Sequence, residues 1–464
     1  MSKGKKDLKV LGIIFGSLIA LIIVVHTIFN IVFSIQLNNK IAELKSQGRP
    51  MTIAEIIPVP VPDEENAAII YNKAFVLMKG EGKSSVDKLT KISKELKSYS
   101  NMSQLTDEQR QEIPQLINSK EMQNIYAILE EGSRKPKCRF NLEYEKGPAI
   151  PLLHLSKMRN SARLLCVKAL LEAEAGQNSQ AFDTLLLGLK ISNHLKDEPI
   201  LISQLARIAC DGIIMECIKG TSDLMGISVE KANLIINELS FHQGIEPFIK
   251  CMDGERVYMG VWAFEEVMHG KISPREMGMW GGMPLWMILY PTRLFRPIQK
   301  KDFTYYLTLI SEIQGSYNIP FYEYVKDQIE EDIPKYCVLT RLILPALGRV
   351  REVVARHQAD IDICRTGLAL KVYHRANNGN YPEKLEELVS AKLLNEVPVD
   401  PFSGKDLVYS RQIGGFKVYS FGPNMQDDFG AKRTFEKDSP AYENYDLVWQ
   451  SQIQLKRSEY IHGN

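Results

Sequence analysis

The sequence lacks an excess of charge of either sign. Its 464 residues carry 57 lysines and arginines against 56 aspartates and glutamates, which gives a formal net charge of +1. A protein that binds nucleic acid needs a basic surface to neutralise phosphates, so we expect no nucleic-acid partner. Charged residues make up 24% and hydrophobic residues 45% of the chain. This composition is typical of globular proteins and argues against disorder on a large scale.

Paired cysteines and the common catalytic motifs are also absent. The seven cysteines are odd in number and include no Cys-x-x-Cys pair, so we expect buried free thiols. The sequence contains no Gly-x-Ser-x-Gly elbow, no phosphate-cradling glycine loop and no His-Glu-x-x-His helix. The sequence therefore gives no support for the serine hydrolases, phosphate-loop enzymes and zinc proteases that carry these motifs. These absences leave room for an enzyme of another kind.

Charged residues are missing between Lys9 and Lys40 as well. Nineteen of residues 10–37 are Ile, Leu, Val or Phe. About 20 apolar residues span a bilayer, whereas a cleavable signal peptide has about 7 to 15 followed by small residues at the cut site. We therefore predict an uncleaved transmembrane anchor at residues 10–37, through which the chain contacts the lipid bilayer.

Lysines precede the predicted span. Lys3, Lys5, Lys6 and Lys9 lie within residues 1–9, and basic residues follow the span at wider spacing. The positive-inside rule then makes residues 1–9 a cytoplasmic tail. We expect a single-pass protein of the cytoplasmic membrane, with its N-terminus inside and its bulk extracytoplasmic.

Prolines and helical patterns divide the part that follows. Four prolines between residues 50 and 62 predict an extended, Pro-containing stalk at residues 38–62. The pattern is then nearly all helical, which predicts an α-helical body at residues 63–349. The polar, lysine-rich stretch at residues 83–123 is expected to be a mobile helical insertion.

The clearest helical unit covers residues 160–195. Apolar residues recur at helical spacing on both sides of Gly176, and the region around Ala181 and Phe182 resembles the turn and second helix of a tetratricopeptide repeat. Repeat arrays need about three copies to bury a continuous core, and no second copy is found. A single helical hairpin within the body is the simpler interpretation.

A broken apolar segment occupies residues 277–294. It contains tryptophans and methionines, is interrupted by glycines and prolines, and is flanked by Arg293 and Arg296. It is too short and too broken to span a bilayer. It is expected to be a loop at the membrane interface, a docking surface for a partner, or a lid buried over the helical core.

The C-terminal quarter predicts a long helix followed by a small sheet. Apolar residues at positions 354, 361, 364, 368 and 372 share one helical face. Gly414 and Gly415 favour a hairpin turn between two strands, and residues 445–449 read as a third strand. The expected fold is therefore mainly α with a C-terminal α+β module, preceded by an N-terminal transmembrane helix and an α-helical body.

Three loops in this quarter carry a family resemblance. They are residues 380–382 (Asn-Tyr-Pro), 397–404 (with Asp-Pro-Phe-Ser-Gly) and 419–424 (with Gly-Pro-Asn), in that order after the long helix. This order resembles the globular domain of the major pseudopilin of bacterial type II secretion systems, over about residues 350–450. The resemblance implies a pseudopilin-like α+β domain at residues 350–455, which leaves a tail at residues 456–464.

The resemblance also implies a calcium site. In that family the loop after the Gly-Pro turn binds calcium through aspartates, and the matching residues here are Asp427, Asp428 and Asp446. Calcium takes six to eight oxygen ligands, which such a loop supplies. The prepilin-peptidase motif of pseudopilins is missing from the N-terminus, so we expect a module reused for packing or interaction.

Two functions remain. The first is a non-catalytic, membrane-anchored scaffold or adaptor of a bacterial envelope, related to type II secretion pseudopilins in its C-terminal domain and bound to envelope proteins. The alternative is a membrane-tethered enzyme whose site lies around Glu265, Glu266 and His269. These side chains share a helical face, but a di-metal bundle needs two such motifs. His357 with Asp360 is similar, and we expect a surface or capping role there.

Overall fold

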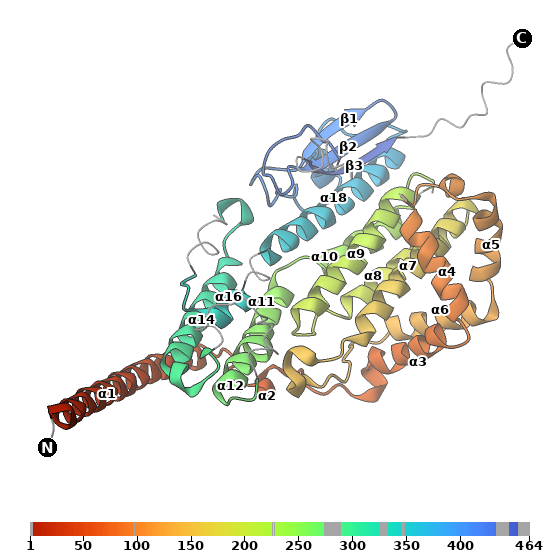
Figure 1. The fold of residues 1–464 in the computed structure, drawn as a ribbon. Helices are drawn as coiled ribbons and strands as arrows, with labels where there is room; N and C mark the ends of the chain where they lie inside the picture. The colour runs from red at the N-terminus through yellow and green to blue at the C-terminus, as the bar shows by residue number, and fades with distance from the viewer. Residues whose placement is uncertain are drawn as a thin grey trace, which may run out of the picture.

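The computed structural model describes residues 3–96, 98–224, 226, 228–272, 289–324, 333–344, 349–432 and 445–452. It confirms the predicted fold class, because the chain is mainly helical, begins with a long apolar helix and has a three-stranded antiparallel sheet near its C-terminus. The first helix projects from one end of the molecule, and the sheet lies on the outer side of the last long helix (Figure 1). Most of the segment at 277–294 and the tail at 456–464 lie outside the described residues.

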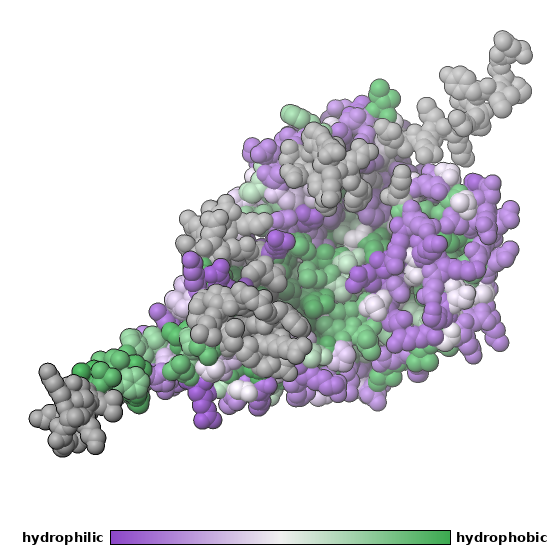
Figure 2. Space-filling model, viewed as in Figure 1, coloured by the Kyte–Doolittle hydropathy of each residue, from purple (hydrophilic) through white to green (hydrophobic). Residues whose placement is uncertain are grey.

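One continuous helix, α1 (Lys3–Ser46), contains the predicted anchor. It is the one helix of the described residues that is long and apolar enough to cross a membrane. Its apolar side chains stand exposed where it projects beyond the body (Figure 2). The helix runs on into the expected stalk, where Leu44 and Met51 are buried against the body. Much of the stalk is therefore packed against the body.

The helical body is an array of antiparallel helices joined by short connections. Its elements are α2 (Ile53–Ile56), η1 (Asp63–Glu65), α3 (Ala67–Lys79), α4 (Lys83–Glu95), η2 (Met102–Gln104), α5 (Asp107–Ile117), α6 (Lys120–Ser133), η3 (Tyr144–Ala149), α7 (Leu153–Glu174), α8 (Asn178–Asn193), α9 (Leu201–Thr221) and α10 (Val229–Ser240). Helices α7 and α8 form the expected hairpin, with Gly176 at a positive φ of 74° in its turn. Glycine adopts that conformation without strain.

The stretch at residues 83–123 belongs to the main core. Val86, Leu89 and Ile113 are at most 1% exposed and pack within the same apolar cluster as α7 and α8. Thr106 accepts a hydrogen bond from the backbone N–H of Gln109, which forms a capping box at the start of α5. The expectation of a mobile insertion was wrong, because the few apolar residues among the lysines all lie on the buried faces.

A second helical group connects the body to α1. Its elements are α11 (Glu246–Gly254), η4 (Glu255–Val261, a π-helical segment), α12 (Trp262–Met268), η5 (Arg293–Phe295), α14 (Arg296–Ser316), η6 (Phe321–Glu323) and α16 (Val338–Ile343). Residues of α11, η4, α12, α14 and α16 share one apolar cluster with Leu37 and Leu44 of α1 and with Val350 and Val354 further along the chain. The end of α1 is thus built into the folded part of the molecule.

The C-terminal module consists of α18 (Val350–Ala376), α19 (Glu386–Ser390), β1 (Val408–Gln412), β2 (Gly415–Ser420) and β3 (Leu447–Gln452). The strands pair in the order β1-β2-β3, with Tyr409 opposite Val418 and Val418 opposite Trp449. All five residues of the predicted apolar face of α18 are buried. Some of these residues pack against the sheet and others against α9 and α10, so body and module share one continuous core.

Candidate functional site

The residues of the enzyme hypothesis lie on the molecular surface. Glu265 on α12 and His269, which directly follows the helix, are exposed, and Glu266 is half-buried, with one carboxylate oxygen 2.8 Å from Nζ of Lys271. The three side chains are not enclosed, and a reaction that must exclude water has no shelter there.

The aspartates of the predicted calcium site are brought close together. Asp446 is buried and accepts backbone N–H groups from Asp428 at 3.3 Å and from Gly430 at 2.6 Å. Burial, and after it the negative charges of Asp428 and Asp427, raise the pKa of Asp446 to about 6. A cation would relieve this repulsion. The carboxylates already accept protein donors, however, and the described residues hold no group of three or more His, Cys, Asp or Glu side chains arranged for a metal.

A different cluster of polar side chains lies at the centre of the molecule. Helix α9 is largely apolar, yet it carries Arg207 and Asp211 one turn apart with both side chains completely buried. Such charges are stable inside a protein only when they are paired and hydrogen-bonded. Here the partners come from several other segments, and we call the set the buried joint. It comprises Ser192, Gln204, Arg207, Asp211, His242 and His357.

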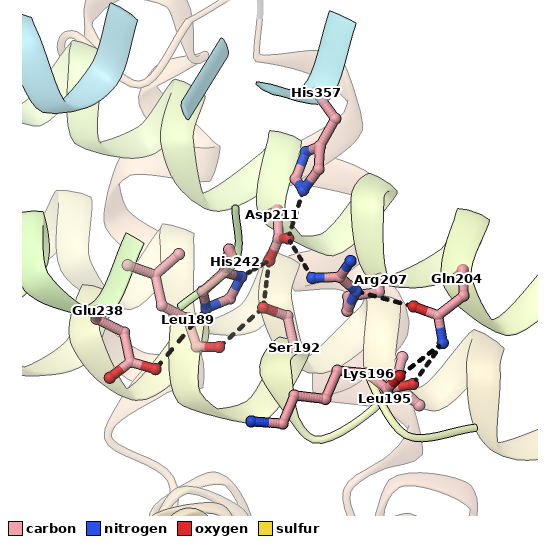
Figure 3. Close-up of polar contacts among 10 residues, drawn as sticks. All are labelled: Leu189, Ser192, Leu195, Lys196, Gln204, Arg207, Asp211, Glu238, His242 and His357. Atoms are coloured by element: carbon pink, nitrogen blue, oxygen red, sulfur yellow. Dashed lines mark hydrogen bonds and ion pairs between the residues drawn. The ribbon is translucent and has the colours of Figure 1, made fainter. Parts of the chain in front are cut away.

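Asp211 is the hub of the buried joint (Figure 3). One carboxylate oxygen lies 3.0 Å from Nδ1 of His242, which follows α10, and accepts a hydrogen bond from the hydroxyl of Ser192 at the end of α8. The other oxygen lies 3.2 Å from Nε2 of His357 on α18 and 4.0 Å from Nη1 of Arg207. One carboxylate therefore links α8, α9, the turn after α10 and α18.

Arg207 extends the buried joint toward the end of α8. Its Nε donates to the amide oxygen of Gln204 at 3.0 Å, and its guanidinium lies 5.5 Å from the ring centroid of Phe248. The Gln204 amide nitrogen donates to the carbonyl oxygens of Leu195, at 2.9 Å, and Glu198, at 2.8 Å. Gln204 thereby satisfies carbonyl groups of the connection between α8 and α9, which would otherwise be buried without partners.

The charges within the buried joint are mutually dependent. Burial alone would raise the pKa of Asp211, but the charge of His242 and the contacts with both histidines outweigh it and hold that pKa well below its ordinary range. Burial lowers the pKa of His242, but the facing carboxylate outweighs burial and raises it to about 8. At His357 burial dominates and lowers the pKa. At neutral pH a charged Asp211 thus faces a charged His242 and a neutral His357.

The residue types of the buried joint are those of hydrolases, but their arrangement is not. The Ser192 hydroxyl donates to the aspartate instead of a histidine, so no base is positioned to activate it. Each of the six side chains is at most 3% exposed, and a substrate therefore has no route to them. The arrangement holds helices together.

Further polar bridges connect α18 to the body on the C-terminal side of His357. The Gln243 amide nitrogen donates to Asp362 at 2.6 Å, Lys219 lies 3.5 Å from Asp360, and Lys371 donates to Asp223. These bridges follow α18 along much of its length. The module is consequently fixed to the body by directional contacts as well as by apolar packing.

His357 does not have the surface or capping role expected from the sequence. The histidine is 3% exposed and turns away from Asp360, whose carboxylate lies near Lys219 instead. The sequence signal for this cluster is the pair Arg207 and Asp211, two opposite charges one turn apart in a helix with a long apolar face. Such a pair predicts polar partners from elsewhere in the chain.

Comparison with known proteins gives no match: no protein-family model, no curated protein and no solved structure matches this chain.

Proposed function

We propose that the protein is a membrane-anchored, extracytoplasmic scaffold or adaptor of a bacterial envelope, and that its C-terminal module is related to type II secretion pseudopilins. The observation that carries this proposal is the buried joint. Asp211, His242 and His357 are used to bind α18 to the body in a closed interior. A rigid connection of this kind suits a protein that presents a surface at a fixed position.

Membrane anchoring is supported by the form of α1. Every described side chain from Val10 to Val25 is exposed and none of these residues is charged. An apolar helix without protein neighbours is stable in lipid. Its side chains are removed from water there, and its backbone groups form hydrogen bonds within the helix. The end of the same helix is packed into the body, so the anchor and the folded part are rigidly joined.

The relationship to pseudopilins is supported by the order of elements after residue 350. A 27-residue helix is followed by a short helix, an Asp-Pro loop and a three-stranded antiparallel sheet packed on the long helix. Asp400 in that loop accepts hydrogen bonds from the Ser420 hydroxyl and the Phe421 backbone N–H, which ties the loop to the end of β2. Calcium at Asp427, Asp428 and Asp446 is part of this proposal.

The scaffold and the enzyme hypotheses are distinguished by site-specific cross-linking in cells. A photo-reactive residue is placed at Ile413 or Phe429, apolar side chains that stand exposed on the module, and at the exposed Val76 of α3 as a control. A scaffold is expected to give a discrete cross-linked envelope partner from the module but not from α3. The double variant Glu266→Ala with His269→Ala should leave that cross-link intact. Cells that carry the variant should have the same cellular phenotype as cells with the wild-type protein.

The contrary result is equally specific. If the module positions give no cross-link, and the double variant abolishes the cellular phenotype while its melting temperature stays at the wild-type value, the scaffold proposal is wrong and the surface of α12 is catalytic. Protease added to spheroplasts tests the topology separately, since an extracytoplasmic body must then be cleaved.

A further inference from the structure

The start of α14 lies beside the predicted membrane anchor. The backbone carbonyl of Leu294 lies 3.1 Å from Nε2 of His26, and Nζ of Lys300 donates to Asn30 at 2.8 Å and to Ser34 at 2.6 Å. These contacts fix η5 and the first turns of α14 against one face of α1. The position of η5 and of the start of α14 along the axis of α1 is therefore known.

The length of α1 shows where that height falls in a bilayer. A hydrocarbon core about 30 Å thick is crossed by about 20 helical residues at a rise of about 1.5 Å each. Counted from Val10, the first residue after Lys9, a span of that length ends near Phe29. Asn30 and Ser34 then lie at the outer interface, and so does Lys300, which binds both. Leu294, level with His26, reaches slightly deeper.

The side chains at this level have the chemistry of a membrane-binding surface. Arg293 and Arg296 flank Leu294, whose side chain is 60% exposed. Neither arginine forms an ion pair with an acidic side chain of the described residues, and no such pair is present for Lys300 either. Burial, followed by the charge of Arg293, lowers the pKa of Arg296, and burial with the charge of Arg296 lowers that of Lys300. These cations repel one another, and within the described parts of the chain no carboxylate pairs with them.

We propose that Arg293, Leu294 and Arg296 form a second membrane contact, in which the two guanidinium groups bind the phosphates of anionic phospholipids and Leu294 enters the acyl region. Guanidinium groups match phosphate oxygens in a bidentate geometry. An apolar side chain between basic ones is typical of segments that lie at the interface. The contact would fix the tilt of the body relative to the membrane, which one helix alone does not do.

This inference rests on the proposed anchoring, so the experiment reports on both separately. The full chain is placed in nanodiscs of phosphatidylcholine, with or without phosphatidylglycerol. Spin labels are attached at Leu18→Cys in the anchor, at Leu294→Cys, or at Ile413→Cys on the exposed hairpin turn. Cys138→Ser serves as the background, because the other six cysteines are buried. Accessibility to oxygen and to a water-soluble nickel chelate gives the depth of each label.

The expected result is a deeply buried label at position 18, a label at interface depth at position 294 and a fully hydrated label at position 413. Phosphatidylglycerol should move the label at 294 deeper, and Arg293→Gln with Arg296→Gln should remove that shift. The matched control, Arg134→Gln with Lys135→Gln, changes two cations that contact Glu130 and the Glu64 carbonyl, and it should leave the shift intact.

Two outcomes would overturn the inference or its basis. If the label at 294 is as hydrated as the label at 413 in both lipid compositions while the label at 18 stays buried, the second contact is refuted and the anchoring stands. If the label at 18 is itself exposed to the chelate, the anchoring is refuted and the second contact falls with it. A shift that survives the arginine substitutions also contradicts the proposed phosphate binding.

Discussion

Nε2 of His357, on the long C-terminal helix, lies 3.2 Å from a carboxylate oxygen of Asp211 at the centre of the helical body. Both side chains are buried, and Ser192 and His242 contact the same carboxylate. A residue of the module therefore completes the polar interior of the body. The two parts of the chain are expected to fold and unfold together.

Asp211→Asn tests how much the contacts of Asp211 contribute to the free energy of unfolding. The substitution leaves the buried Arg207 guanidinium without its carboxylate partner and removes the charge that keeps His242 protonated, so we expect a loss of about 3–5 kcal/mol of unfolding free energy. Chemical denaturation of the detergent-solubilised chain measures it. Asp183→Asn, which breaks the exposed ion pair with Lys231, is the control and should cost less than about 1 kcal/mol. Equal losses in the two variants would contradict the importance of the buried joint.

The pH dependence of stability follows from the two histidines. His242, which faces Asp211, Glu238 and Arg207, has a folded pKa of about 8, above its ordinary value. Its contribution to the free energy of unfolding is about 2 kcal/mol. This contribution is complete below about pH 6.5 and is lost as the pH rises through 8. The folded pKa of His357 is lowered, so its contribution is lost as the pH falls below about 6.5. The stabilisation contributed by these two histidines is therefore greatest near pH 6.5.

Melting temperatures across this range check the assignment. In His242→Gln the decline between pH 6.5 and 8 should become smaller, with the remainder due to the raised pKa of Glu255, and in His357→Gln the decline on the acidic side should become smaller. Asp211, whose pKa is held low, adds a loss only at more acidic pH, near the ordinary aspartate value of about 4. A wild-type profile that is flat from pH 6 to pH 8.5 would be incompatible with a charged His242.

Gly367→Ala tests the contact between α18 and the sheet. A Cβ atom at Gly367 would lie 2.0 Å from Cε3 of Trp449, so the indole ring must move. We expect a loss of about 1–3 kcal/mol from overpacking. Gly212→Ala in α9 is the matched control, because a Cβ there meets nothing within 4 Å and alanine is the better helix former. The control should be neutral or stabilising by up to about 1 kcal/mol, and a loss as large as that of Gly367→Ala would show that helix glycines are needed for another reason.

The calcium proposal predicts a ligand-dependent rise in stability. At 10 mM free calcium and a dissociation constant of about 0.1–1 mM, the stabilisation should be about 1–3 kcal/mol. It is measured as a shift in melting temperature, with magnesium as the control ion. Asp428→Ala should remove the shift. A wild-type protein that does not respond, or an Asp428→Ala variant that responds equally, would rule out the site.

Much of the fold could be predicted because apolar periodicity and turn residues are local signals. The buried face of α18, the hairpin at Gly414 and Gly415 and the long apolar helix were all visible in the sequence. The third strand was displaced by about two residues, from 445–449 to Leu447–Gln452. Strand ends depend on pairing with β2, which no local pattern encodes.

The buried joint could not be predicted in the same way. His242 and His357 each appear in a stretch where a surface histidine would be unremarkable, and only the tertiary packing of α9, α10 and α18 brings them to Asp211. The polar stretch at residues 83–123 was misjudged for a related reason. Its composition is that of an exposed segment, whereas a minority of apolar side chains, Leu89 and Ile113 among them, packs α4 and α5 onto α7.

The central claim, that body and module form one rigid unit, is tested most directly by hydrogen exchange of the full chain, followed by mass spectrometry. The account predicts that amides in the middle of α18, around Ile361 and Leu368, exchange with the same opening free energy as those of α9, and that Asp211→Asn lowers both values together. Exchange in α18 that is markedly faster than in α9, and insensitive to Asp211→Asn, would show that the module opens independently and would contradict the account.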